Sequence, residues 1–112
     1  MAQTIFIVTS RGSDARELED KINTVFGDKV DVHPVYRTYQ FPEIVAGDIV
    51  ISDGTSKTRQ DDTSLYPCIF DCKQITESAG GVHLAVSTTT GQFDMLTTGM
   101  PILTEISNQL RK

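Results

Sequence analysis

The sequence has few of the residues that mark specialised classes of protein. Of its 112 residues, two are cysteine and none is tryptophan. Two cysteines allow at most a single disulfide bridge, and we expect reduced thiols in a cytoplasmic protein over such a bridge. The sequence also lacks an apolar run near the roughly 18 residues of a membrane-spanning helix, and it lacks a secretory pattern. We therefore expect neither a membrane span nor export.

Positive charge is scarce as well. Ten Lys and Arg stand against fifteen Asp and Glu, which gives a net charge of −5. The basic residues are scattered, and the largest grouping before the C-terminal pair is Lys57 with Arg59. Because nucleic-acid binding needs a basic patch, we expect no nucleic-acid partner. A hydrophobic content of 38% in a chain of this length predicts one soluble domain over residues 1–112.

The clearest local pattern lies in the first thirty residues. The apolar run Ile5–Val8 predicts a buried strand, and it leads through a Ser/Gly turn into an amphipathic helix. The apolar residues of this helix recur at helical spacing: Leu18, Ile22, Val25 and Phe26. Asp14 and Glu17 are spaced as a capping box, and Gly27 follows the last apolar position, where a left-handed residue is usual. A strand, a turn and a helix in this order open a doubly wound α/β fold.

Strands and helices alternate along the rest of the chain. We predict five strands, at Ile5–Thr9, Val30–Val35, Asp48–Ser52, Pro67–Phe70 and Val82–Val86. Further helices are predicted from Pro42 to Gly47, around Lys73 to Ser78, and near Pro101 to Arg111. Continuously apolar strands indicate burial on both faces, hence parallel pairing with right-handed crossovers. The expected fold is a single doubly wound, flavodoxin-like parallel sheet with helices on both faces.

Several of these segments resemble a response-regulator receiver domain. The run IFIVTSRGSDARELEDKI resembles the first strand and helix of that family. DIVISDG resembles its third strand, which ends in the phospho-accepting aspartate, and Asp53 corresponds to that residue. YPCIF and AGGVHLAV resemble the fourth and fifth strands, and the final helix fits the family's last helix. The resemblance implies a receiver-like fold and a role in signalling.

The chain departs from the receiver pattern where phosphotransfer needs its chemistry. Thr9 and Ser10 replace two metal-binding acids, and Ser87 replaces a lysine. Asp53 would therefore lack the Mg²⁺ that neutralises phosphoryl oxygens during transfer. The resemblance thus implies a pseudo-receiver, a non-catalytic module that binds a partner protein and needs no cofactor.

A second resemblance is to the sugar phosphotransferase IIB subunits of the galactitol type. It rests on the segments GVHL and GMP in the C-terminal third of the chain. Those subunits need a phosphorylated cysteine after the first strand, and the run from Thr9 to Arg11 contains no cysteine.

Polar residues that follow three of the predicted strands form the candidate ligand site. They are Ser10, Arg11, Gly12 and Ser13, then Asp53, Gly54 and Thr55, then Ser87 and Thr88. A helix N-terminus offers free N–H groups to an anion, and side-chain hydroxyls can bind phosphate or ribose. The plainer interpretation is that these residues only cap a helix and close turns.

Other polar residues carry weaker signals. Cys68 and Cys72 are four apart, and neither His33 nor His83 completes a metal-ligand spacing with them, so we predict no metal site. His83 stands inside an apolar strand, which predicts a half-buried ring with a hydrogen-bonded nitrogen.

Three functions therefore remain open at the level of sequence. The first is a protein-interaction module, and the second is a binder of a phosphate-containing small molecule or nucleotide. The third, the least favoured, is a small enzyme that uses Asp53 with Ser10 or Ser13 on a phosphorylated substrate.

Overall fold

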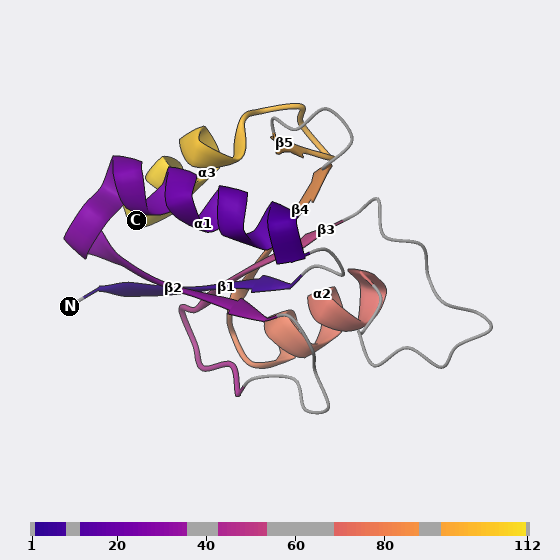
Figure 1. Cartoon of the computed structure of the whole chain (residues 1–112). Coiled ribbons are helices and arrows are strands. Elements are labelled where there is room, and N and C mark those ends of the chain that lie inside the picture. Colours follow the sequence, from indigo (N-terminus) through magenta and orange to yellow (C-terminus); the bar gives the residue numbers. More distant parts are fainter. Residues whose placement is uncertain (1, 9–11, 36–42, 54–68, 88–92, 112) are drawn as a thin grey trace.

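The chain folds around one five-stranded, mostly parallel sheet (Figure 1). The computed structural model describes residues 2–8, 12–35, 43–53, 69–87 and 93–111. The strands are β1 (Gln3–Val8), β2 (Val30–Val35), β3 (Ile49–Asp53), β4 (Val82–Ser87) and β5 (Asp94–Met95). The helices of the described part are α1 (Gly12–Phe26), α2 (Ile69–Ser78) and α3 (Ile102–Leu110), with a short 3-10 turn at Gly27–Lys29. The predicted α/β class is therefore confirmed.

The sheet has the strand order β2-β1-β3-β4-β5. The first four of these strands are parallel, and β5 pairs antiparallel with β4. Side chains alternate between the two faces of each strand, so Ile5 and Ile7 of β1 point to one face while Phe6 and Val8 point to the other. Because both faces carry apolar side chains, the continuous apolar runs in the sequence correspond to strands that are buried on both sides.

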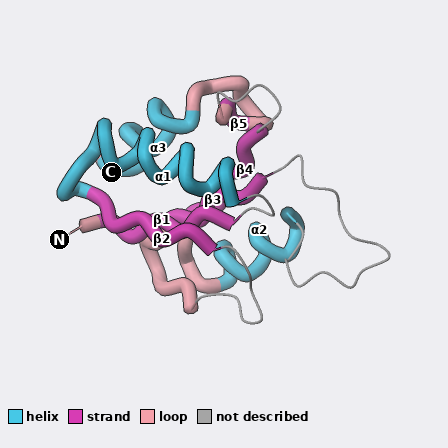
Figure 2. Tube along the Cα trace, viewed as in Figure 1, coloured by secondary structure: helices cyan, strands magenta, loops and turns pink. Residues whose placement is uncertain are grey.

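Helices cover both faces of the sheet, as Figures 1 and 2 show: α1 and α3 lie on one face and α2 lies on the other. The larger core lies under α1 and α3. It joins Ile5, Ile7, Ile49, Ile51, Leu84 and Val86 of the sheet to Ala15, Leu18 and Ile22 of α1 and to Ile102 and Ile106 of α3. The core on the α2 face is smaller and contains Val8, Ile44 and Val50 with the partly buried Phe6 and Ala79. None of the described helices has the length and apolar character needed to cross a membrane.

The first helix follows the predicted pattern with two differences at its ends. It begins at Gly12, so Asp14 lies inside the first turn and not at the N-cap position that the capping box requires. Val25, predicted on the buried stripe, is 57% exposed. An amphipathic pattern gives the direction of the buried face but not how far the neighbouring elements extend. Gly27 has φ +54°, which confirms the left-handed position predicted after the helix.

The predicted strand at Pro67–Phe70 is wrong where the structure describes it. Ile69 and Phe70 begin α2, which continues through the predicted helical segment from Lys73 to Ser78; Pro67 and Cys68 lie outside the described residues. A short apolar run is compatible with a strand and with a buried helix turn, because too few residues are present to show a period.

The fifth strand of the sheet is instead β5, which the sequence did not reveal. It has two residues and is antiparallel to β4. The expectation of an entirely parallel sheet is therefore wrong for this outermost strand. Two residues cannot display an alternating pattern, and tertiary pairing alone defines this strand.

The prediction of a short helix from Pro42 to Gly47 is also wrong, as far as the structure describes this segment. Glu43, Ile44 and Val45 have no regular structure and lead into a turn at Ala46 and Gly47, while Pro42 lies outside the described residues. The carboxylate of Asp48 accepts a hydrogen bond from the backbone N–H of Val45 at 3.0 Å. This side-chain contact stabilises a turn in place of a helical one.

Candidate functional site

The carboxyl ends of β1, β3 and β4 lie together at one edge of the sheet. The strand register pairs Val8 of β1 with Ser52 of β3, and Asp53 of β3 with Val86 of β4. Helix α1 begins at Gly12, shortly after β1 ends. We call this edge the carboxyl edge.

The order of the strands reverses at the carboxyl edge. The chain proceeds from β1 to β2 on one side of the sheet, and from β3 to β4 on the other side. The two crossovers therefore diverge between β1 and β3, and a crevice forms at such a point in open α/β sheets.

The structure places four of the predicted site residues at the carboxyl edge. Gly12 and Ser13 open α1, Asp53 is the last residue of β3, and the half-buried Ser87 is the last residue of β4. The other predicted residues lie outside the described part of the chain: Ser10, Arg11, Gly54, Thr55 and Thr88. For Ser13 and Asp53, the description covers the backbone alone.

A polar pair between β3 and β4 lies on the sheet face that carries α2. The Ser52 hydroxyl and Nε2 of His83 are 2.7 Å apart, which is a short hydrogen bond. Ser52 is 3% exposed and His83 is half-buried. The prediction of a half-buried histidine with a hydrogen-bonded nitrogen is therefore confirmed.

Sequence reasoning missed Ser52 as the partner of His83. The two residues are 31 positions apart, so no local spacing relates them. The alternation of apolar residues in their strands does place both on the face opposite the larger core, since Ile51 and Leu84 belong to that core. The sequence therefore indicates that the two side chains share a face of the sheet. The strand register that brings them into contact is set only when the sheet assembles.

The surroundings of His83 keep its imidazole uncharged at neutral pH. Burial lowers the pKa of His83 below its usual value of 6.5, the Glu77 carboxylate acts in the opposite direction, and the Lys73 ammonium lowers the pKa further. The enclosed Ser52 hydroxyl and the His83 ring form a polar contact between two strands.

The second histidine has different surroundings. His33 is exposed on β2, where its Nε2 lies 2.9 Å from the Asp31 carboxylate and its ring packs 5.7 Å from the ring of Phe6. Strands β1 and β3 lie between His33 and His83 in the sheet. Within the described ranges, no group of three His, Cys, Asp or Glu side chains is arranged to hold a metal ion. Cys68 lies outside those ranges, and only the backbone of Cys72 is described.

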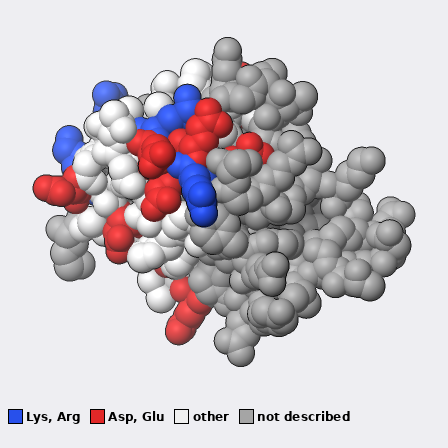
Figure 3. Space-filling model, in the orientation of Figure 1, with Lys and Arg blue, Asp and Glu red and all other residues white. Residues whose placement is uncertain are grey.

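Charges of both signs are mixed on the surface over α1. Figure 3 shows acidic and basic side chains side by side on the described part of this face. This visible surface therefore does not present a large field of one sign that would steer a charged partner.

No protein-family model, curated protein or solved structure matches the chain. The receiver-like and IIB-like resemblances therefore depend on the sequence segments alone.

Proposed function

We propose that this chain is a non-catalytic binding domain of doubly wound, receiver-like arrangement, and that it binds a phosphate-containing small molecule at the carboxyl edge. The observation that supports the proposal is the reversal of strand order between β1 and β3. Open α/β sheets bind their ligands outside the carboxyl ends of the strands at such a reversal. We infer that the ligand contains phosphate from the types of residue that follow these strands.

The proposed ligand contacts come from three segments that follow strands. They are Ser10, Arg11, Gly12 and Ser13 after β1, Asp53, Gly54 and Thr55 at the end of β3, and Ser87 and Thr88 at the end of β4. The first turn of α1 has backbone N–H groups without helical partners, and the helix dipole favours an anion there. Arg11 would supply a cation, whereas the Asp53 carboxylate would repel an anion unless a metal ion lay between them.

The test is a titration with inorganic phosphate and with nucleotides, each with and without Mg²⁺. Arg11→Ala should weaken the binding of phosphate or nucleotide about tenfold or more, because a charge-assisted hydrogen bond contributes roughly 1.5–3 kcal/mol. The melting temperature without ligand should stay nearly unchanged.

Arg16→Ala is the matched control for the Arg11 variant, since Arg16 is an exposed arginine of α1 beyond its first residues. It should bind as the wild type does. Absence of saturable binding for every ligand, or equal losses in the two arginine variants, would contradict the phosphate proposal.

The second candidate function is a protein-interaction module that has lost phosphotransfer. It is favoured by the position of Asp53, the last residue of β3, which is the place of the phospho-accepting aspartate in the receiver resemblance. In contrast, β1 ends at Val8, and Thr9 and Ser10 follow in place of the metal-binding acids. A receiver scaffold without these acids would act through its surface and not through a phosphoryl group.

Loss of phosphotransfer predicts that Asp53 is not phosphorylated by a small phosphodonor. The protein is incubated with Mg²⁺ and acetyl phosphate and then weighed intact, with Asp53→Asn as the control. We expect no adduct, because no carboxylate pair holds the metal that neutralises the transferring group. A phosphate adduct in the wild type that is missing from Asp53→Asn would refute the loss of phosphotransfer.

The protein partner is tested by photo-crosslinking in a lysate of the source cells. One crosslinking residue replaces Asp53 at the carboxyl edge, and another replaces Lys29, which lies just before β2 at the opposite edge. A partner that crosslinks from position 53 and not from position 29 supports the interaction module. Equal crosslinking from the two positions argues against it.

A further inference from the structure

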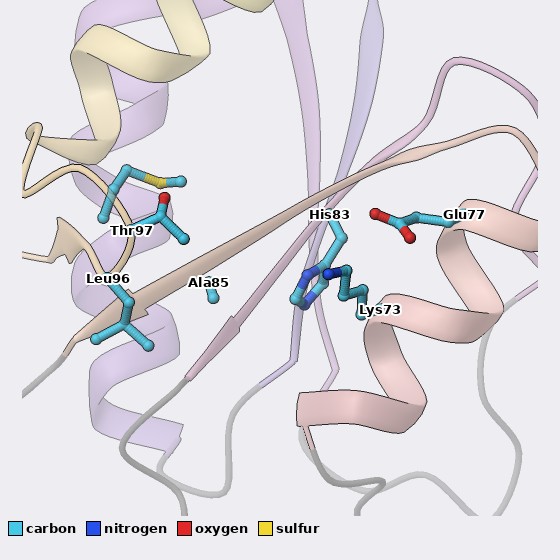
Figure 4. Close-up of a pocket in the computed structure, with 7 residues that line it drawn as sticks. Lys73, Glu77, His83, Ala85, Leu96 and Thr97 are labelled. Atoms are coloured by element: carbon cyan, nitrogen blue, oxygen red, sulfur yellow. The ribbon is translucent and has the colours of Figure 1, made fainter.

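A pocket of about 380 Å³ opens on the sheet face that carries α2 (Figure 4). In the described part of the chain three elements line it: α2 contributes Lys73 and Glu77, β4 contributes His83 and Ala85, and β5 with the following turn contributes Met95, Leu96 and Thr97. None of these residues belongs to the site proposed at the carboxyl edge.

The pocket exists because α2 and the β5 turn stand apart on either side of β4. Helix α2 packs on β3 and β4, and Ala79 behind its last turn joins the smaller core. On the other side, the backbone N–H of Leu96 donates a hydrogen bond of 3.0 Å to the carbonyl of Ala85, which holds the turn against β4. Ala85 has a short side chain, so the floor between the two walls stays open.

The two walls of the pocket differ in chemistry. Figure 4 shows Lys73, Glu77 and His83 gathered at one end and Leu96 at the other. Lys73 and Glu77 are four residues apart on α2 and therefore share one face of the helix. A largely apolar lining with a few polar groups is the usual composition of a small-molecule site.

The polar end carries one charge of each sign. The His83 ring is neutral at pH 7 and is held by Ser52 at 2.7 Å, so Lys73 and Glu77 supply the charges among the lining residues that the structure describes. Both groups are exposed, and a ligand with a single charge could pair with only one of them. A ligand head with an ammonium and a carboxylate would satisfy both.

We propose that this pocket binds a small zwitterionic molecule with an apolar body, of the class of the apolar α-amino acids. The Lys73 ammonium pairs with the ligand carboxylate, and the Glu77 carboxylate pairs with the ligand ammonium. The apolar side chain of the ligand contacts Ala85 and Leu96. The volume lies near the lower end of the range for ligand pockets, which suits a molecule of this size. The inference is independent of the phosphate site.

The test begins with calorimetric titration of the protein with leucine and three analogues. Leucinol lacks the carboxylate, 4-methylpentanoate lacks the ammonium, and glycine lacks the apolar side chain. We expect saturable binding of leucine and affinities at least about tenfold lower for each analogue, since each loses one set of contacts. Absence of leucine binding, or an analogue that binds as tightly as leucine, overturns the proposal.

Variants place the binding in this pocket. Lys73→Gln should weaken leucine binding about tenfold, while Lys21→Gln, an exposed lysine of α1, should leave it unchanged. Equal affinities in the two lysine variants overturn the assignment. Arg11→Ala should also leave leucine binding unchanged, which separates failure of this site from failure of the phosphate site.

Two further measurements are independent of the lysine variants. Ala85→Leu should fill the floor and abolish binding; if circular dichroism shows that this variant is unfolded, Leu96→Asp replaces it, because Leu96 is 47% exposed. In the wild type, leucine should shift the ring proton resonances of His83 in NMR spectra. Undisturbed His83 resonances at saturating leucine overturn the proposal.

Discussion

A hydrogen bond between Ser52 and His83 joins the neighbouring strands β3 and β4 on the α2 face. Ser52 is buried and His83 is half-buried, and a buried polar group without a partner costs about 1–3 kcal/mol. Each group therefore satisfies the other. The same burial opposes protonation of the imidazole, so the native structure prefers the neutral ring.

The preference for a neutral His83 predicts lower stability in mild acid. The folded-state pKa lies below the usual 6.5, so the unfolded chain takes up the proton first as the pH falls. The contribution of the neutral His83 to the free energy of unfolding is fully present above about pH 6.5. It is lost as the pH falls through the folded-state pKa. Urea unfolding from about pH 8 to about pH 5 should show a decreasing free energy of unfolding.

His83→Gln should reduce this pH dependence, because the substitution removes the titrating group. His33→Gln is the control: it removes an exposed imidazole on β2 and should retain most of the decrease seen in the wild type. A His83→Gln variant with the same pH profile as the wild type would refute the prediction.

The helices on the two faces of the sheet contribute differently to the core. Leu18 and Ile22 of α1 and Ile102 and Ile106 of α3 are buried together above one face. In the described part of α2, Thr76 is the buried residue, and the helix covers a smaller apolar cluster. Most of the hydrophobic stabilisation therefore lies on the α1 and α3 face.

Ile106→Ala should lower the free energy of unfolding by about 2–5 kcal/mol, because the truncation leaves a cavity between α3 and the sheet. Val25→Ala on α1 is the matched control, since Val25 is 57% exposed and its truncation should change stability by less than about 0.5 kcal/mol. Chemical denaturation of both variants gives the comparison. Similar losses for the two would mean that α3 does not pack as described.

The whole molecule is organised by a sheet with protected central strands and less protected edges. Among the strands that the structure describes, β1 and β3 each pair with a strand on both sides, while β2 pairs with β1 alone and β5 is a two-residue strand at the other end of the order. Opening of an edge breaks fewer contacts than opening of the centre. The molecule should therefore open locally from its edges.

Hydrogen exchange measures this order directly. We expect the slowest backbone amides in β1 and β3, faster exchange in β2, and the fastest exchange among the strands in β5. Exchange in β2 as slow as in β3 would contradict the strand order or reveal a partner that covers the β2 edge.

Local sequence patterns determined the parts of this protein that depend on neighbouring residues. The helical spacing of Leu18 and Ile22 predicts α1, and Ile102 and Ile106 do the same for α3. The run from Val30 to Val35 predicts β2 with its observed bounds. The position of the candidate phosphate site at the carboxyl ends of the strands also follows from the order of strands and helices. Each of these predictions needs only a period or a turn residue that a few neighbouring positions supply.

The tertiary structure alone decided which strands are neighbours, and with them the sites between elements. The reversal between β1 and β3, the antiparallel β5 and the helical state of Ile69 and Phe70 each depend on packing across the molecule. The Ser52–His83 hydrogen bond and the pocket between α2 and β5 bring together residues far apart in sequence. A one-residue change in register would turn a strand's side chains to the other face, and simultaneous packing of both helix layers selects the register.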